Sequence, residues 1–366
     1  KPLTDTIGQP ELQEKIRSIL QGLYGIMKKA DRYIRFAFLT GVTRYGKLGI
    51  FSAANNPQDI SMNDDFASIC GITEEELRRY FDAEVEVFAK KQHVDKDAMY
   101  EMLKQKYDGY HFSSNSEDIY NPFSLLNSLK TRSLSNYWFA TGTPTYLVTI
   151  LKKKSYDLSK FSRGVTVMVE SMTSFGNGDG SVIAALYQSG YLTIKSYDGK
   201  KYYRLGFPNE EVEDGFVQCL MEEYTVTTSG EIDEDLQHLG SLISMGDING
   251  FMTQIQQIMS QIPFESNEPK LIEANFRNML YLMIRSTGHK VLVEYPVLGG
   301  RIDVFFQTEQ FAYVIECKRD QSAAEALAQI DEKKYADKLS VQNKKIVKIG
   351  VNFSTEERNL TEWKEG

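Results

Sequence analysis

Cysteine and histidine are scarce in this sequence of 366 residues. The three cysteines, Cys70, Cys219 and Cys317, lie far apart, and none of the four histidines has a second histidine at a metal-ligand spacing. Zinc motifs place such residues in close pairs, so the sequence argues against a zinc module and against a histidine-rich metal site. So few cysteines are typical of a reducing compartment, and we expect the protein to be cytoplasmic.

Long apolar runs and an excess of positive charge are also missing. No segment approaches the roughly 20 apolar residues of a membrane-spanning helix, so we expect no membrane segment. The formal net charge is −8, which is not that of a protein that binds nucleic acid through its bulk charge. Any contact with nucleic acid must therefore come from local patches, such as Lys344, Lys345 and Lys348. The G-x-S-x-G motif of many serine hydrolases is absent as well.

The remaining composition is that of a soluble globular protein. Hydrophobic residues make up 42% and charged residues 25% of the chain, which is ordinary for this class, and the length allows two or three domains. The apolar segment 33–40 predicts a buried strand of a parallel sheet. Thr73 and Glu76 form a capping-box pattern at the start of a helix. The clearest predicted helices cover 11–29, 73–91, 95–109, 210–224 and 251–262. We expect an α/β multidomain protein.

Residues 181–208 predict a helix, a strand, a turn and a second strand. Asp198-Gly199 lies between two strand-forming runs and is a hairpin signal. This order is compatible with a winged helix, and equally with any small α+β module.

The pattern changes after a linker-like stretch that begins at Pro263. The predicted elements are a helix at 270–286, strands at 290–295, 301–306 and 311–318, a helix at 322–338 and a strand at 345–353. This order predicts a compact α/β domain.

Gly41 to Lys47 match the phosphate-binding loop pattern G-x-x-x-x-G-K and follow the strand predicted at 33–40. Two features oppose nucleotide binding. Leu48 stands where Ser or Thr would bind Mg²⁺, and the next residues do not predict the helix whose N-terminus binds phosphate. We therefore predict that this chain neither binds ATP tightly nor hydrolyses it.

Three charged residues, Asp303, Glu316 and Lys318, lie inside or at the end of apolar strands, where an uncompensated carboxylate is costly. Residues two apart in a strand share a face, so Glu316 and Lys318 point the same way, and a hairpin can bring Asp303 close to them. Adjacent carboxylates raise each other's pKa unless a cation lies between them. Mg²⁺ prefers such oxygen ligands and can polarise a phosphoryl group and activate water. Lys318 could position that water or stabilise the developing negative charge.

A simpler interpretation of the same residues remains open. Asp303 could pair with Arg301, and Glu316 with Lys318, as surface ion pairs on an edge hairpin. Such pairs contribute about 0–1 kcal/mol.

Several ordered segments resemble one bacterial family, including "RFAFLTGVTRYGKLGIFSAANNPQDISM", "KYDGYHF", "NYWFATGTP", "GRIDVFF" and "YVIECKRD". Members of that family fuse an AAA-type ATPase-like region to a PD-(D/E)XK nuclease-like domain. The resemblance implies that the phosphate-binding loop lies upstream of Lys1, that the strand ending at Thr40 is a sensor strand, and that Thr40 and Arg44 are remnants of a nucleotide site. The chain, which starts without Met, is then a fragment or a processed chain.

The resemblance also implies a domain plan. Residues 1–72 would be a partial ATPase-like core, and 73–262 a mostly helical middle region with the winged-helix-like element around 181–208. Residues 263–366 would form a restriction-endonuclease-like α/β domain with a mixed sheet.

By the same resemblance, Asp303, Glu316, Lys318 and Glu273 are catalytic or metal-binding positions. Gln329 and Tyr335 would be supporting residues that face the site, and the backbone carbonyl of Cys317 would be a metal ligand for Mg²⁺ or Mn²⁺.

The implied function is metal-dependent cleavage of DNA or another nucleic acid. The alternative is a regulatory or interaction protein that uses a nuclease-like fold only for binding, with the middle region contacting a protein partner. An ATP-driven switch is a third alternative, which depends on the upstream nucleotide motifs.

Overall fold

The structure is a computed structural model. It describes residues 9–41, 58–139, 147, 151, 156–173, 180–225, 229–262, 269–297, 300–335, 339 and 343–366. The chain divides into two compact units. Unit 1 comprises Lys1–Thr141 and Gly164–Glu213, and unit 2 comprises Gly142–Arg163 and Asp214–Gly366. No helix among these residues combines the length and the apolar character needed to cross a membrane.

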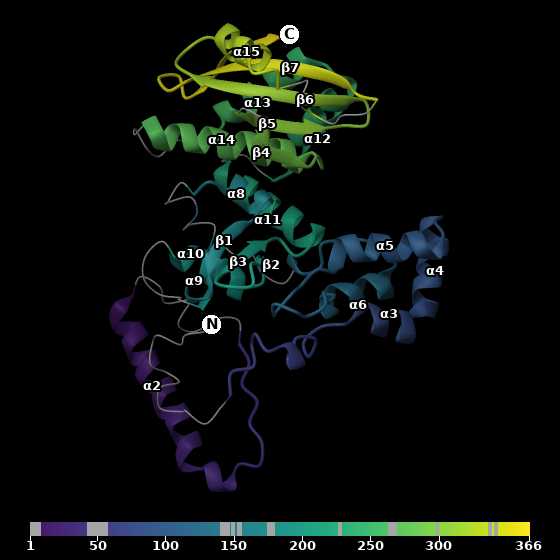
Figure 1. The fold of residues 1–366 in the computed structure, drawn as a ribbon, viewed down its shortest axis with the longest axis vertical. Helices are drawn as coiled ribbons and strands as arrows, with labels where there is room; N and C mark the ends of the chain where they lie inside the picture. Colours follow the sequence, from purple (N-terminus) through teal and green to yellow (C-terminus); the bar gives the residue numbers. More distant parts are fainter. Residues whose placement is uncertain are drawn as a thin grey trace. The chain divides into compact units, whose positions relative to one another are not determined.

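Unit 1 is mostly helical (Figure 1). Its helices are α2 (Pro10–Lys29), α3 (Glu74–Tyr80), α4 (Asp82–Gln92), α5 (Lys96–Tyr107), α6 (Pro122–Thr131), α9 (Val169–Thr173) and α10 (Gly180–Gln188), with short 3₁₀ turns at Asp31–Tyr33 and Asp64–Phe66. Its strands β1 (Val165–Met168), β2 (Thr193–Tyr197) and β3 (Tyr202–Gly206) form one antiparallel sheet in the order β1-β3-β2.

Helices α3 to α6 pack around a shared apolar core that includes Phe88, Tyr100, Tyr107 and Leu125, all almost fully buried. The predicted capping box begins α3, because the Thr73 hydroxyl accepts the N–H of Glu76 and the Glu76 carboxylate accepts the N–H of Thr73. The helix predicted at 73–91 is divided in two at Phe81. The predicted helix and hairpin of 181–208 are confirmed as α10, β2 and β3.

The prediction of a buried strand at 33–40 is wrong for this structure. Residues 34–41 form neither a helix nor a strand, and Phe36 is 82% exposed. A strand exists only where a neighbouring strand pairs with its backbone, and no strand of the described part of the chain pairs with this segment. Arg44 and the phosphate-loop pattern after Gly41 lie outside the described residues.

Unit 2 contains a five-stranded mixed sheet. Its strands are β4 (Val291–Val297), β5 (Gly300–Gln307), β6 (Phe311–Arg319), β7 (Lys345–Ser354) and β8 (Asn359–Glu365), in that order across the sheet. Only the β6–β7 neighbours are parallel. Its helices are α8 (Ser159–Arg163), α12 (Ser229–Met245), α13 (Ile248–Ser260), α14 (Pro269–Ser286) and α15 (Ala323–Glu332), and α11 (Glu210–Tyr224) begins in unit 1 and continues into unit 2.

The mixed sheet confirms the predicted C-terminal α/β domain, with two differences. The helix predicted at 322–338 ends at Glu332, and Lys334 then takes a left-handed φ of 51°. The sheet also gains an edge strand, β8, that the apolar pattern did not predict, because its sequence NLTEWKE is largely polar.

Helices cover both faces of the sheet (Figure 1). A parallel pair such as β6 and β7 needs a crossover connection, and α15 supplies it on one face. On the other face, Phe251 of α13 packs against Phe306 and Tyr313, and Phe276 of α14 stacks on Phe353. Polar bonds also fix α13 to the sheet, since Trp363 donates to Asn249 and Gln256 donates to the Leu360 carbonyl.

Gly350 lets α15 lie directly on β7. A Cβ at this position would be only 2.5 Å from the backbone nitrogen of Leu327, and it would also overlap the carbonyl oxygen of Ala323. Backbone atoms of a packed helix cannot move aside as a flexible side chain can, so the helix would have to shift.

Gly350→Ala is therefore expected to lower the free energy of unfolding by about 1–3 kcal/mol, measured by urea-induced unfolding. Gly230→Ala is the matched control, because Gly230 in α12 has no atom within 4 Å of the added carbon. We expect the control to be neutral or to stabilise by up to about 1 kcal/mol. Equal effects of the two changes would contradict the close approach of α15.

Candidate functional site

Asp303 and Glu316 adjoin where strands β5 and β6 stop pairing. The last pair of their ladder beside the site is Val304 and Ile315, so the next two opposite positions are Asp303 and Glu316. There the Asp303 carboxylate accepts the backbone N–H of Cys317 at 2.8 Å. A side chain thus takes the place of the next ladder bond, and the two carboxylates lie side by side at the end of the paired region.

Glu316, Lys318 and Gln329 form one hydrogen-bonded group. Lys318 Nζ donates to Gln329 Oε1 at 2.5 Å and lies 3.6 Å from Glu316 Oε1, and Gln329 Nε2 donates to the same glutamate oxygen. The predicted common face of Glu316 and Lys318 is therefore present, with α15 above it. Gly350 pairs with Glu316 in the β6–β7 register, so the close approach of α15 at that glycine brings Gln329 to the glutamate.

The surface ion-pair interpretation holds only in part. The Glu316–Lys318 pair is present, but Glu316 is only 2% exposed, so this pair is not a surface pair. Arg301 pairs with Glu294 at 3.1 Å. Glu316 therefore belongs to a buried polar site.

Burial controls the protonation of both carboxylates. Burial and the nearby charge of Asp303 raise the pKa of Glu316 to about 8, against the lowering effect of Lys318. Burial also raises the pKa of Asp303, whereas the Cys317 N–H and the charges of Lys318 and Arg277 lower it. Without a bound metal ion, Glu316 therefore carries a proton at neutral pH.

This protonation makes stability depend on pH. Above the ordinary glutamate pKa of 4.5 the unfolded chain releases the proton that folded Glu316 retains up to about pH 8. The contribution of this group to stability is complete below pH 4.5 and is lost as the pH rises through 8. The Gln side chain of the Glu316→Gln variant cannot titrate. In EDTA, the free energy of unfolding of this variant should therefore exceed that of the wild type by about 1–3 kcal/mol at pH 8.5 and by little at pH 5.

Urea-induced unfolding at the two pH values checks this expectation. Glu332→Gln is the control, because Glu332 is exposed at the end of α15, and it should change stability by less than about 0.5 kcal/mol at both. A pH-independent gain for Glu316→Gln would contradict the buried proton.

The donor set fits a divalent metal ion. Glu316 Oε2 is buried and has no hydrogen-bond partner among the described residues, and the Asp303 carboxylate lies beside it. Mg²⁺ is commonly held by one or two carboxylates, with water and substrate phosphate completing its shell. No group of three or more His, Cys, Asp or Glu side chains suited to a metal occurs in the part of the chain that the structure describes, so these two carboxylates are the side chains that could hold one.

The other predicted site residues are placed as follows. Burial raises the pKa of the Cys317 thiol well above its ordinary value, which makes the thiol a poor metal ligand and leaves the backbone carbonyl as the predicted one. Tyr335 is 2% exposed and belongs to the apolar cluster with Ile302 and Ile330, and its supporting role stays a prediction. Glu273 lies in α14, and its side chain is outside the described structure.

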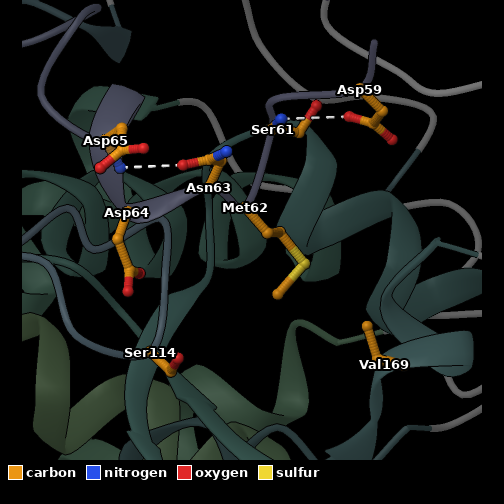
Figure 2. Close-up of a pocket in the computed structure, with 8 residues that line it drawn as sticks. All are labelled: Asp59, Ser61, Met62, Asn63, Asp64, Asp65, Ser114 and Val169. Carbon is orange, nitrogen blue, oxygen red and sulfur yellow. Dashed lines mark hydrogen bonds between the residues drawn. The ribbon is translucent and has the colours of Figure 1, made fainter.

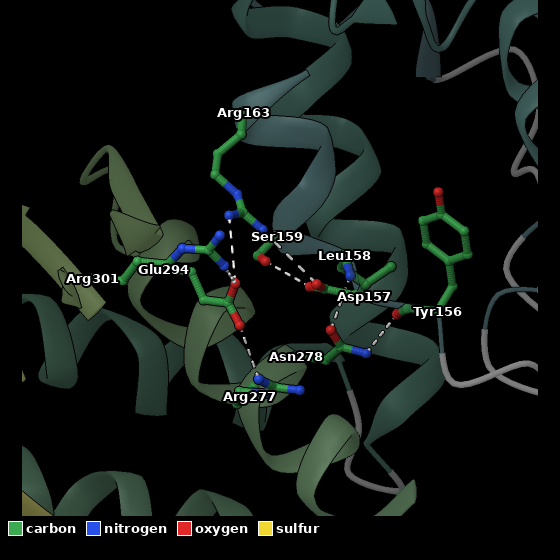
Figure 3. A network of polar contacts seen from close by, with 9 residues as sticks. All are labelled: Tyr156, Asp157, Leu158, Ser159, Arg163, Arg277, Asn278, Glu294 and Arg301. Atoms are coloured by element: carbon green, nitrogen blue, oxygen red, sulfur yellow. Dashed lines mark hydrogen bonds and ion pairs between the residues drawn. The ribbon is translucent and has the colours of Figure 1, made fainter. Parts of the chain in front are cut away.

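Sequence reasoning missed an arginine cluster around Glu294 (Figure 3). Glu294 in β4 accepts from Arg277 at 3.3 Å and from Arg301 at 3.1 Å, and it lies 3.7 Å from Arg163. Its backbone has a left-handed φ of 47°, which costs a non-glycine residue about 1–2 kcal/mol. In the sequence, the only indication of this cluster is Glu294 itself, a charged residue within the apolar run VLVEYPV.

A pocket of about 580 Å³ lies elsewhere, in unit 1 (Figure 2). Its polar lining belongs mostly to turns. Asp59 accepts the N–H of Ser61, Asn63 accepts the N–H of Asp65, and Asp64 accepts the side chain of Asn115. We interpret these groups as loop caps and assign them no chemistry.

Comparisons with known proteins also indicate a nuclease-like domain in the C-terminal part of the chain. Residues 271–363 match the PD-(D/E)XK nuclease superfamily, and residues 1–51 match a predicted AAA-ATPase. A protein of Azotobacter chroococcum mcd 1, described as "Uncharacterized protein in vnfD 5'region", is 31% identical over 98% of this chain and 69% of its own length. No solved structure matches the chain.

Proposed function

The chain belongs to the same family as the Azotobacter chroococcum protein and joins a predicted AAA-ATPase segment to a PD-(D/E)XK nuclease superfamily domain, and we propose that this domain hydrolyses phosphodiester bonds of nucleic acid with a divalent metal ion. The observation that carries the proposal is the position of Asp303 opposite Glu316, whose Oε2 is buried and has no hydrogen-bond partner among the described residues, with Lys318 3.6 Å from the other glutamate oxygen. DNA is the first substrate to test.

Each residue has a distinct role in this proposal. Asp303 and Glu316 would hold Mg²⁺ or Mn²⁺, together with the Cys317 carbonyl, and Glu273 of α14 is a further candidate ligand. A metal ion held there would supply polarisation of the phosphoryl group and a lowered pKa for the attacking water. Lys318 stabilises the negative charge that develops on the phosphoryl oxygens. Gln329 is a positioning residue, because it contacts both Lys318 and Glu316.

The proposal also covers the domain plan and the compartment. The match at 271–363 supports a nuclease-like domain at 263–366, and the match at 1–51 supports a partial ATPase-like core at 1–72. All three cysteines are free thiols, which suits the cytoplasm.

The test is cleavage of supercoiled plasmid, single-stranded DNA and RNA by the full chain with Mg²⁺, Mn²⁺ or EDTA. We expect nicking or degradation of at least one substrate with metal and none with EDTA. A second measurement titrates Mn²⁺ into the protein by calorimetry. No heat at millimolar metal, together with no metal-dependent cutting, would favour a nuclease-shaped binding protein instead.

A further inference from the structure

Three arginines of unit 2 gather on one carboxylate beside the candidate site. Arg163 comes from α8, Arg277 from α14 and Arg301 from β5, and all three have a guanidinium nitrogen within 4 Å of the Glu294 carboxylate (Figure 3). A second carboxylate, Asp157, lies 3.9 Å from Arg163. Three positive charges thus face two negative charges on a chain whose net charge is −8.

The strand register places this cluster next to Asp303. The β4–β5 ladder pairs Val293 with Val304 and Tyr295 with Ile302. The two positions between these pairs are Glu294 and Asp303, which therefore stand opposite each other in the ladder. The left-handed backbone at Glu294 interrupts the strand at that point, and strained backbone of this kind is concentrated at functional sites.

The cluster is open to a ligand. The Arg301 side chain is 67% exposed and the Arg277 side chain is 38% exposed. The lysine patch expected from the sequence, Lys344, Lys345 and Lys348, is less available for binding nucleic acid. Lys344 donates to the Thr308 carbonyl at 2.6 Å, and Lys348 pairs with Asp331 at 2.6 Å. Both lysines already have protein partners, and Lys345 pairs in register with Phe311, at the end of β6 away from Glu316.

We propose that Arg277 and Arg301 form a binding site for a backbone phosphate of nucleic acid beside Asp303, and that Glu294 holds the two guanidiniums in place until the phosphate replaces it. This inference rests on the proposed function and names how its substrate is held. A guanidinium can bind phosphate through two parallel hydrogen bonds. Arg163 keeps Glu294 paired after the other two arginines turn to the phosphate, so the carboxylate is not left without a cation.

The test is binding of a fluorescent 20-nucleotide DNA, single-stranded and duplex, to the full chain in EDTA, where no metal-dependent cutting occurs. Arg301→Gln and Arg277→Gln are each expected to weaken binding about 10-fold at 0.1 M salt. Each should also reduce the slope of log K against log salt by about 0.7–0.9, the loss of one phosphate contact. A merely structural role would leave that slope unchanged.

Two further variants keep the test decisive. Lys345→Gln removes the same charge from the first residue of β7, at the end of the β6–β7 ladder away from Glu316, and should change neither affinity nor slope. Arg301→Lys keeps the charge and should restore the salt slope but only part of the affinity. If Arg277→Gln does not fold, the more exposed Arg301 carries the test alone.

The outcomes separate this inference from the proposed function. Unchanged slopes in both arginine variants, with wild-type cleavage intact, would overturn the phosphate site and leave the nuclease standing. Arginine-dependent DNA binding by a wild type that never cuts would support the phosphate site and reject the nuclease. An equal loss of binding in Lys345→Gln would overturn the site in favour of a diffuse basic surface.

Discussion

Asp303→Asn should abolish metal-dependent cleavage while leaving the fold intact. The change removes one of two adjoining carboxylates and keeps the shape and an oxygen that can accept the N–H of Cys317. A metal ion supplies several kcal/mol of transition-state stabilisation, so the expected loss in rate is on the order of 10³-fold or more. Calorimetry with Mn²⁺ should show weaker binding. The midpoint temperature of thermal unfolding in EDTA at pH 8.5, where both carboxylates are ionised, should be unchanged or higher, because the repulsion between them is relieved.

The matched control for this change is Asp331→Asn. Asp331 is an exposed carboxylate of α15 that pairs with Lys348, so its removal should leave metal binding and cleavage within about twofold of the wild type. Full cleavage by Asp303→Asn, or an equal loss in both variants, would show that the β5–β6 junction is not the metal site.

Lys318→Met should separate metal binding from chemistry. The substitution keeps a long apolar stem and removes the ammonium that bonds Gln329 and neighbours Glu316. We expect Mn²⁺ to bind still, because the carboxylates remain, and cleavage to fall by about 10²–10³-fold, the usual cost of losing one group that stabilises transition-state charge. The decisive comparison is the calorimetric affinity for Mn²⁺ against the single-turnover cleavage rate.

Lys348→Met provides the reference for that comparison. Lys348 lies in β7 and contacts Asp331 rather than the carboxylates of the site. Its loss should lower cleavage by less than about threefold. If Lys318→Met lost metal binding and cleavage together, Lys318 would have a structural role in forming the site instead of a chemical one.

The core of this site was predictable because it depends on local chain geometry. Period-two alternation places Glu316 and Lys318 on one face, and the strand-forming runs around Asp303 and Glu316 predict the hairpin that joins them. Gln329, which only the family resemblance indicated, follows in the next helix, and in the structure it contacts both Glu316 and Lys318. The whole group comes from one continuous stretch of chain.

The errors lie where distant parts of the chain decide the outcome. Residues 33–40 have a strand-like sequence, but a strand requires a partner. Lys333 and Lys334 are good helix formers, yet the chain turns there after α15. The role of Glu294 depends on Arg163, from a helix more than a hundred residues earlier, and no local pattern indicates such a contact.

The way unit 2 is assembled limits how the catalytic region can be isolated. Its sheet is covered by α13, which precedes the family-matched segment, and Tyr313 donates from the sheet to the carbonyl of Ile243 in α12. Asn278 of α14 is likewise bonded to the backbone of Tyr156 and Leu158. A recombinant fragment that began at residue 263 would expose the aromatic side of the sheet and lose both supports, so it should aggregate on expression. The shortest soluble piece has to carry the helices upstream of the boundary that the sequence suggests.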